Sequence, residues 1–502
     1  MLRKSLYYST LFSSVYVVKL QSQVRLEDII PPISNKAKSY EKKLLGMLNQ
    51  EGRPGNLTAE EEGKLKELWA ATLKVFGKTA SSDLASVENE VEGYNATGST
   101  DTLQVPGTSP VPKKRGRLTR MLTRSKSDAS DVSDNSLRMT PSATSLASQS
   151  SSKDESDKYS QSTEFKEALA TQTPQELRDQ FWSMVKADHP DGLLLRFLRA
   201  RKWDVQKALI MMISTMHWRG KEMNVEKIMR GGELGAIQDG DDQFILQIRK
   251  GKSIIHGTDN DGRPVCIVRS RLHRPAEQTA RVMECYTVYI METARLMLRG
   301  PVDTASIIFD LSNIEAKYMD LTPVRFIIKC FEAHYPESLG VCCIYGAPWF
   351  FRPVWSVVKG LLDPVVANKI RFANSTAELE TFLPGPDIIK ELGGPRDWEY
   401  EYIEPAQNEN DLMKDTVTRD KLLADRAKLY DQFEMLTKKW FLKQLDAGGV
   451  QRREACAKAL EQDYWKIDPY VRAKTHYDRV GYLEPDGKFN PRATHVDTAL
   501  AA

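Results

Sequence analysis

The residues best suited to chemistry in this sequence are basic side chains at the end of one predicted helix, joined by charged residues that follow two later elements. Arg196, Arg199, Arg201 and Lys202 lie at the helix end, and Glu337 and Lys369 follow the later elements. Guanidinium and ammonium groups suit a phosphate group, because Arg can hold it through two parallel hydrogen bonds. The alternative is a solvated basic helix face whose salt bridges arise by chance.

The sequence shows no motif for catalysis or for nucleotide or metal binding. Gly251-Lys252-Ser253 matches the end of a phosphate-binding loop, but Leu246 stands where that loop needs its first glycine. There is no G-x-S-x-G nucleophile elbow, and the seven histidines form no H-x-x-x-H or Cys/His pattern. We therefore expect a protein that is not an enzyme and that has no metal and no cofactor.

The segment 346–369 predicts an apolar helix with hinge-like residues at both ends. Two stripes lie side by side at helical spacing, one with Phe351, Trp355, Val358 and Leu362, the other with Phe350, Val354, Val357 and Leu361. Gly346 precedes the helix and Gly360 lies near its end. The large aromatic side chains suit a membrane interface. This pattern is typical of a movable lid over an apolar cavity, and a plain core helix is the alternative.

Short apolar runs alternate with helices in the middle of the chain and define its fold class. The runs are 264–268, 306–311 and 341–345, and the helices between them are 280–298 and 322–334. This alternation predicts a mainly parallel sheet with helical crossovers. Residues 164–233 read as helices, with Pro174 at the first position of one and Gly231-Gly232 at the end of the block. The predicted fold class is therefore α/β with an amino-terminal helical subdomain.

Composition divides the chain into seven parts. An extension at 1–52 precedes a helix at 53–76, where Thr58 and Glu61 are spaced as a capping box. A linker at 77–163 leads to the helical subdomain at 164–239 and the α/β body at 240–403. Residues 404–486 predict a charged helical hairpin that turns at Gly448-Gly449 and stops at Asp468-Pro469, and 487–502 form a tail.

The linker is expected to be disordered, because Ser, Thr, Asp, Gly and Pro dominate it. It contains a basic cluster of Lys113, Lys114, Arg115, Arg117, Arg120, Arg124 and Lys126. Thr123 and Ser127 each follow a basic residue by three positions, a pattern that basic-directed kinases favour. Phosphate there would partly neutralise the cluster, so the linker is either a regulatory element or an inert spacer.

Charge and cysteine content limit the remaining function classes. The 502-residue chain has a net charge of +3, too small for a global field that would attract nucleic acid. No run approaches the roughly 20 apolar residues that span a bilayer. The six cysteines lie mostly in apolar runs without a C-x-x-C pair, which fits buried reduced thiols in a cytosolic protein.

Several motifs, in the expected order, resemble the CRAL-TRIO lipid-binding family, and especially the phosphatidylinositol transfer proteins of its fungal branch. They are LLRFLRARKWD at 194–204, DGRPV at 261–265, IIFDL at 307–311, YPE at 335–337, APWFF at 347–351, LLDP at 361–364 and NKI at 368–370. RPGNLT at 53–58 resembles the start of the family's first helix. The resemblance implies an α/β cup at 240–403 that holds one lipid with its acyl chains buried.

The resemblance also implies roles for individual residues. The family's inositol-phosphate site maps onto Arg201, Lys202, Glu337 and Lys369. The gating helix maps onto Phe350, Phe351, Val354, Trp355, Val358, Leu361 and Leu362. Val366 departs from the family pattern, because relatives carry a hydroxyl there. Ala305 and Ile307 stand where relatives that hold phosphatidylcholine carry hydroxyls, so we expect the choline site to be lost.

Together these features favour a non-enzymatic phosphatidylinositol transfer or presentation protein, which exchanges one buried phospholipid with membranes when the lid opens. Burial of acyl chains, at about 0.8 kcal/mol per CH₂, suits a dedicated cavity. We expect a cytoplasmic monomer that touches intracellular membranes transiently and peripherally. The alternatives are an adaptor that controls a lipid-metabolising enzyme, a carrier of sterol or haem, and a lipid hydrolase, which lacks a visible nucleophile.

Overall fold

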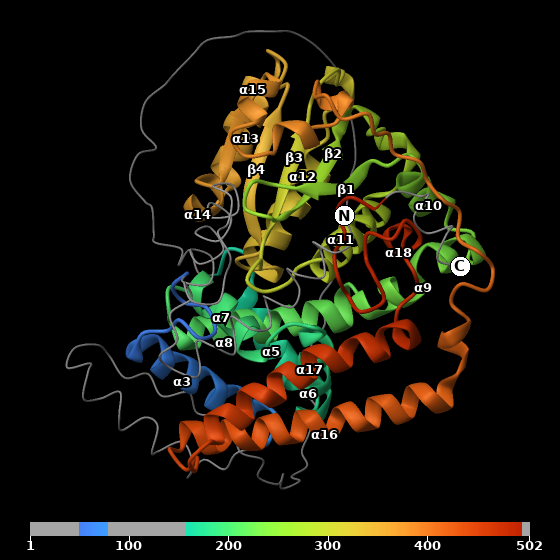
Figure 1. The fold of residues 1–502 in the computed structure, drawn as a ribbon. Coiled ribbons are helices and arrows are strands. Elements are labelled where there is room, and N and C mark those ends of the chain that lie inside the picture. Colours follow the sequence, from blue (N-terminus) through green and yellow to red (C-terminus); the bar gives the residue numbers. More distant parts are fainter. Residues whose placement is uncertain (1–49, 79–156, 494–502) are drawn as a thin grey trace, which may run out of the picture.

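The computed structural model describes residues 50–78 and 157–493, which form a sheet above a layer of helices in the view of Figure 1. The linker's basic cluster, with Thr123 and Ser127, lies outside the described residues, as do residues 1–49 and 494–502. Residues 157–163, which the sequence placed in the linker, belong to the folded part, because helix α5 already begins at Gln161.

Five strands form the sheet in the order β1-β2-β3-β4-β5. They are β1 (Ser253–Thr258), β2 (Pro264–Arg269), β3 (Ala305–Asp310), β4 (Leu339–Tyr345) and β5 (Ile370–Ala373). β1 pairs antiparallel with β2, and the other three pairs are parallel. The predicted α/β fold with a mainly parallel sheet is confirmed, but the sequence missed β1 and β5.

Helices connect the parallel strands. The crossovers are α11 (Ala280–Leu296), then α12 (Leu321–Lys329) with the π-helix η7 (Cys330–His334), then α13 (Phe351–Leu361) with the short α14 (Pro364–Ala367). A tight turn precedes β2, in which the backbone nitrogen of Gly262 donates to the carbonyl oxygen of Asp259 at 3.0 Å. No helix in the described ranges is long and apolar enough to cross a bilayer.

The two faces of the sheet are covered to different degrees. On one face, Ile267, Ile308 and Cys343 are buried beneath the segment 376–392, which includes α15 (Thr376–Leu379). On the other face, Ala305, Ile307 and Phe309 alternate with these buried positions of β3 and are only half buried. Because successive side chains of a strand point to opposite faces, this second face is incompletely covered by helices.

The amino-terminal helices and the carboxy-terminal hairpin share one core. They are α3 (Ala59–Val75), α5 (Gln161–Thr171), α6 (Pro174–Val185), α7 (Pro190–Ala200), α8 (Val205–His217), α16 (Thr416–Phe441) and α17 (Gly449–Val471). The capping box at α3 and the proline at the start of α6 are confirmed. Trp69 packs 5.6 Å from both Phe181 and Phe433, measured between ring centroids. The predicted hairpin is therefore an integral part of the helical layer, as Figure 1 shows.

Buried ion pairs fix the hairpin on the body. Arg453 of α17 donates to both carboxylate oxygens of Asp191 at 2.7 and 2.6 Å, and the Trp69 indole donates to the same group. Arg178 of α6 pairs with Glu434 of α16 at 2.7 and 3.0 Å. Breaking a buried pair leaves an uncompensated charge and costs several kcal/mol, so these contacts specify where the hairpin docks.

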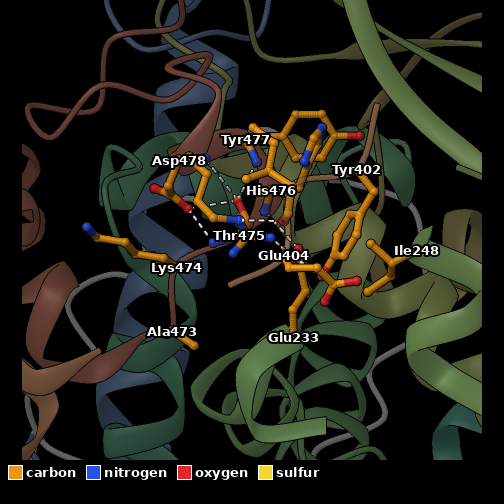
Figure 2. A network of polar contacts seen from close by, with 12 residues as sticks. Glu233, Ile248, Tyr402, Glu404, Ala473, Lys474, Thr475, His476, Tyr477 and Asp478 are labelled. Atoms are coloured by element: carbon orange, nitrogen blue, oxygen red, sulfur yellow. Dashed lines mark hydrogen bonds and ion pairs between the residues drawn. The ribbon is translucent and has the colours of Figure 1, made fainter. Parts of the chain in front are cut away.

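Glu233 anchors the last part of the chain (Figure 2). It lies on α9 (Val225–Gln238) and accepts hydrogen bonds from the hydroxyls of Tyr289 and Tyr402 at 2.7 and 2.9 Å. The backbone nitrogen of His476, the first residue of α18 (His476–Arg479), donates to it at 2.7 Å, and Arg479 forms an ion pair with it. The buried carboxylate is thus fully partnered, as buried charges must be.

Two predicted helix ends are wrong. Gly231-Gly232 does not end the helical block, because α9 continues to Gln238 and α10 (Asp242–Arg249) follows. Gly232, at φ +54°, only kinks α9, and a Cβ there would lie 2.7 Å from the Cβ of Ala473. Pro469 does not stop α17, which runs on to Val471, because a proline in the last turn removes just one helical hydrogen bond.

Candidate functional site

A cavity of about 800 Å³, its open mouth included, lies against the incompletely covered face of the sheet. Its apolar wall consists mainly of Leu193, Phe197, Cys266, Ile290, Met291, Ala294, Leu298, Ala305, Ile307 and Phe331, from α7, β2, α11, β3 and η7. Its polar wall consists of Asp188, Arg196, Arg219, Arg295, His334, Tyr335 and Ser338. A largely apolar cavity with a few polar groups on its wall is typical of a ligand site.

Glu337 and Lys369, two of the predicted site residues, meet beside this cavity. The Lys369 Nζ lies 3.6 Å from Glu337 Oε2, and Pro336 and Ser338 on either side of Glu337 line the cavity. Both side chains are partly exposed, so the pair contributes about 1 kcal/mol or less, and a phosphate can compete for the ammonium. The backbone of Glu337 has φ +53°, a costly conformation that clusters at functional sites.

Arg201 and Lys202 follow the carboxyl end of α7. The Arg201 Nη2 donates to Gln161 Oε1 at 2.7 Å, and Arg201 forms no ion pair with any described residue. Burial lowers the pKa of Arg201, and the charges of Asp363 and Glu332 partly oppose that shift. Lys202 is exposed on left-handed backbone at φ +51°. Within residues 157–493, no hydrogen bond or ion pair joins these two residues to Glu337 or Lys369.

Arg196 connects α7 with Glu337. Its Nη1 donates to the carbonyl oxygen of Glu337 at 2.9 Å, and its Nη2 donates to that of Asp303 at 2.5 Å. One turn later on α7, the pKa of Arg199 is lowered to about 9 by burial and by the charges of Arg53 and Arg196. Arg53 Nε pairs with the Asp303 carboxylate at 2.7 Å. Arg196 thus brings a positive charge to the cavity wall, and the Asp303 carboxylate beside it pairs with both Arg53 and Arg199.

Helix α13 covers the outer part of the same sheet face. Phe351 is buried with Ile344 of β4, and Trp355 packs edge-on against Phe372 of β5 at 5.1 Å between centroids. By contrast, Val357 on the second predicted stripe is 49% exposed. The second stripe is not separate from the sheet contact, however, because Phe350 and Val354 pack against the same cluster as Phe351. Gly346 before the helix has φ +62°, and a Cβ there would lie 2.2 Å from Ser312 Oγ.

A short segment that leads into α5, residues 157–161, contacts the far end of α13, and we term it the strap. Lys158 Nζ donates to the Leu361 carbonyl oxygen at the end of α13 and, at 2.7 Å, to Glu332 Oε2. The Tyr159 hydroxyl donates to the same Glu332 oxygen at 2.7 Å, and the backbone nitrogen of Asp363 donates to Glu332 Oε1 at 2.6 Å. Glu332, whose side chain is 6% exposed, therefore holds the strap and the helix end together.

Comparison with known proteins assigns this chain to a protein family. The model for the CRAL/TRIO domain matches residues 248–394, and the model for the CRAL/TRIO N-terminal domain matches residues 161–214. A CRAL-TRIO domain-containing protein of Schizosaccharomyces pombe is 39% identical over 86% of this chain and 93% of its own length. The chain belongs to the CRAL-TRIO family.

Two other CRAL-TRIO relatives have names that state a function or location. The phosphatidylinositol transfer protein CSR1 of Eremothecium gossypii is 41% identical over 61% of this chain and 71% of its own length. The Sec14 cytosolic factor of Schizosaccharomyces pombe is 28% identical over 41% of this chain and 74% of its own length. The solved structure of Sfh5 overlaps 47% of this chain and 77% of that chain with 16% identity and a TM-score of 0.34.

The CRAL-TRIO site was only partly visible in the sequence. The sequence predicted Glu337 and Lys369, whose side chains form an ion pair. It also predicted Arg201 and Lys202, which lie at the carboxyl end of α7. It grouped Arg196 with the basic residues but gave it no role, and it missed Glu332 and the strap entirely. Nothing in the spacing of residues 157–161 and 332 marks them as partners, because more than 170 positions separate them.

Proposed function

We propose that this protein transfers phosphatidylinositol between membranes without catalysing a reaction. The observation that carries the proposal is the apolar cavity whose wall includes Arg196 of α7 and adjoins the Glu337–Lys369 pair. A lipid with buried acyl chains and an anionic head group matches this combination. The names of similar proteins, including CSR1, support the same assignment.

The inositol phosphate would bind between α7 and the start of β5. Arg201 and Lys202 would contribute positive charge from one side and Lys369 from the other, while Glu337 would accept hydrogen bonds from inositol hydroxyls. Val366, which lacks a hydroxyl, is half buried just before Lys369, so it supplies no contact of that kind. The protein would act in the cytoplasm and associate transiently and peripherally with membranes.

Helix α13 would serve as the gate. Trp349 is 84% exposed and Phe372 is 46% exposed, and Arg352, Lys359 and Arg371 are exposed around them. An apolar surface with basic neighbours suits an anionic bilayer, where aromatic side chains enter the interface and cations meet lipid phosphates. Opening would turn α13 about Gly346 and require release of its far end from the strap.

The head-group assignment is tested with the purified full chain and vesicles that contain labelled phosphatidylinositol. We expect Lys202→Ala combined with Lys369→Ala to abolish transfer, because both ammonium groups are lost from the phosphate site. The matched control is Lys390→Ala with Lys488→Ala, two exposed lysines paired with carboxylates elsewhere. Undiminished transfer by the folded first variant, or equal loss in the control, contradicts the assignment.

The gate is tested at Trp355. We expect Trp355→Asp to slow exchange strongly, because the charge would enter either the sheet contact or the membrane interface, while Trp355→Phe should keep most of the rate. Circular dichroism checks that both variants fold. An unchanged exchange rate in folded Trp355→Asp refutes the gate, and complete unfolding supports the plain core helix instead.

A further inference from the structure

His334, the last residue of η7, is a buried polar side chain without a partner. It is 3% exposed, and neither ring nitrogen has a hydrogen-bond partner among the described residues. Buried polar side chains are nearly always hydrogen-bonded, so each exception needs a physical explanation. His334 also lines the 800 Å³ cavity, so a bound ligand is within its reach.

The ring of His334 is held in place by its surroundings. It stacks on Trp218, with centroids 3.9 Å apart and planes inclined by 4°. Trp218 begins the π-helix η3 (Trp218–Glu222), and His334 ends the π-helix η7. The carbonyl oxygen of Ala333 accepts from the Thr215 hydroxyl at 2.9 Å, which fixes η7 on α8. π-helical turns occur frequently at functional sites, and here two of them position one ring at the cavity.

The other polar side chains on the cavity wall are already engaged within the protein. Arg219 pairs with Glu292 at 2.6 Å, and the Tyr335 hydroxyl donates to the same carboxylate at 2.9 Å. Arg295 pairs with Asp188 at 2.7 Å. Arg196 donates to two carbonyl oxygens, and the Ser338 hydroxyl donates to the carbonyl oxygen of Tyr335. By contrast, His334 also lines the cavity, but its ring nitrogens form no hydrogen bond with any described residue.

The imidazole is neutral in this environment. Burial holds the pKa of His334 well below its ordinary value, and the positive charges of Lys329 and Arg219 lower it further. A neutral imidazole carries one N–H donor and one acceptor nitrogen. It therefore suits a neutral polar group of a ligand rather than a phosphate, which Arg201, Lys202 and Lys369 would hold in the proposed function.

We propose that the His334 N–H donates a hydrogen bond to an ester carbonyl of the glycerolipid in this cavity and so favours ester-linked over ether-linked lipids. The proposal rests on the proposed function. Its geometric basis is continuity along the chain: His334 lies three residues before Glu337, and Pro336 and Ser338 line the same wall. In a phospholipid, the ester carbonyls lie between the head group and the acyl chains. If Glu337 contacts the head group, His334 is therefore placed to contact an ester carbonyl.

The test compares the diacyl and dialkyl ether forms of phosphatidylinositol with the same chain length, presented in vesicles to the full-length protein. A net hydrogen bond of typical strength corresponds to about a five-fold preference, so the wild-type protein should bind the diacyl form about five-fold more tightly. His334→Phe keeps a ring that can stack on Trp218 but has no donor, so it should bind both forms equally. His273→Phe, which makes the same change at a histidine that does not line the cavity, should keep the preference.

Three results separate the possible failures. Equal binding of both lipids by the wild-type protein overturns the role of His334 but leaves phosphatidylinositol transfer standing. A preference that persists in His334→Phe also overturns it. Binding of neither lipid by the wild-type protein overturns the proposed function itself. If His334→Phe does not fold, His334→Gln supplies an amide donor at this position and should keep the ester preference, and loss of the preference there overturns the proposal.

Discussion

Removal of the Glu332 carboxylate tests whether the strap holds the gate closed. Glu332 accepts from Asp363 at the end of α13 and from Lys158 and Tyr159 of the strap. Glu332→Ala therefore frees the end of the gate from the η7 turn and leaves the bond from Lys158 of the strap to the Leu361 carbonyl oxygen. We expect lipid exchange to become faster, because opening no longer breaks these contacts.

The magnitude follows from the contacts that opening must break. The hydrogen bond from the Asp363 backbone to a charged carboxylate contributes about 1.5 kcal/mol. The bond from Lys158 to Leu361 adds little, since Lys158 is 42% exposed and its charge is screened by water. A loss of about 1.5 kcal/mol raises the open-to-closed ratio about ten-fold, so exchange limited by opening should accelerate by up to that factor.

Two measurements check this expectation. Stopped-flow transfer of a fluorescent phosphatidylinositol to acceptor vesicles gives the rate, and hydrogen exchange at residues 361–365 reports release of the helix end. Glu391→Ala is the matched control, because Glu391 is likewise a carboxylate with two side-chain partners, Arg269 and Arg271, but it lies under the opposite sheet face. An unchanged rate together with faster hydrogen exchange refutes the gate as the limiting step. Unchanged hydrogen exchange refutes the strap itself.

Three further predictions follow from the cavity and from the packing around it. Phosphatidylcholine transfer should be weak, since Ala305 and Ile307 offer no hydroxyl to its head group and each lost contact costs about 1–3 kcal/mol; vesicle assays check this, and Ala305→Ser with Ile307→Thr should raise transfer if the choline site was lost there. Gly232→Ala should lower the free energy of unfolding by about 2 kcal/mol or more, because the position needs φ +54° and a Cβ would lie 2.7 Å from a neighbouring Cβ, whereas Gly231→Ala, with open space around it, should change chemical denaturation little. Burial lowers the pKa of His256 to about 4, so the unfolded chain takes up a proton that the folded chain does not between pH 6.5 and 4; the free energy of unfolding should fall as pH falls through this window, and His256→Phe should reduce that slope.

The sequence alone determined the elements whose signals are local. The capping box at Thr58 and the proline at the start of α6 set helix starts, because each satisfies or removes orphan backbone donors within one turn. The β-branched runs of β2, β3 and β4 determined the mainly parallel sheet in the same way, since they alternate with helices of crossover length. Motif order then revealed the family, and with it the candidate residues Glu337 and Lys369.

The tertiary structure decided what depends on partners far away in the chain. β5 has four residues, two of them exposed, and becomes a strand because β4 offers an edge to pair with. β1 contains the polar His256 and a glycine, and its pairing with β2 makes it a strand. The contacts of Glu332 with the strap and the unsatisfied ring of His334 likewise arise only when distant segments pack together, because burial and hydrogen-bond partners are properties of the folded chain.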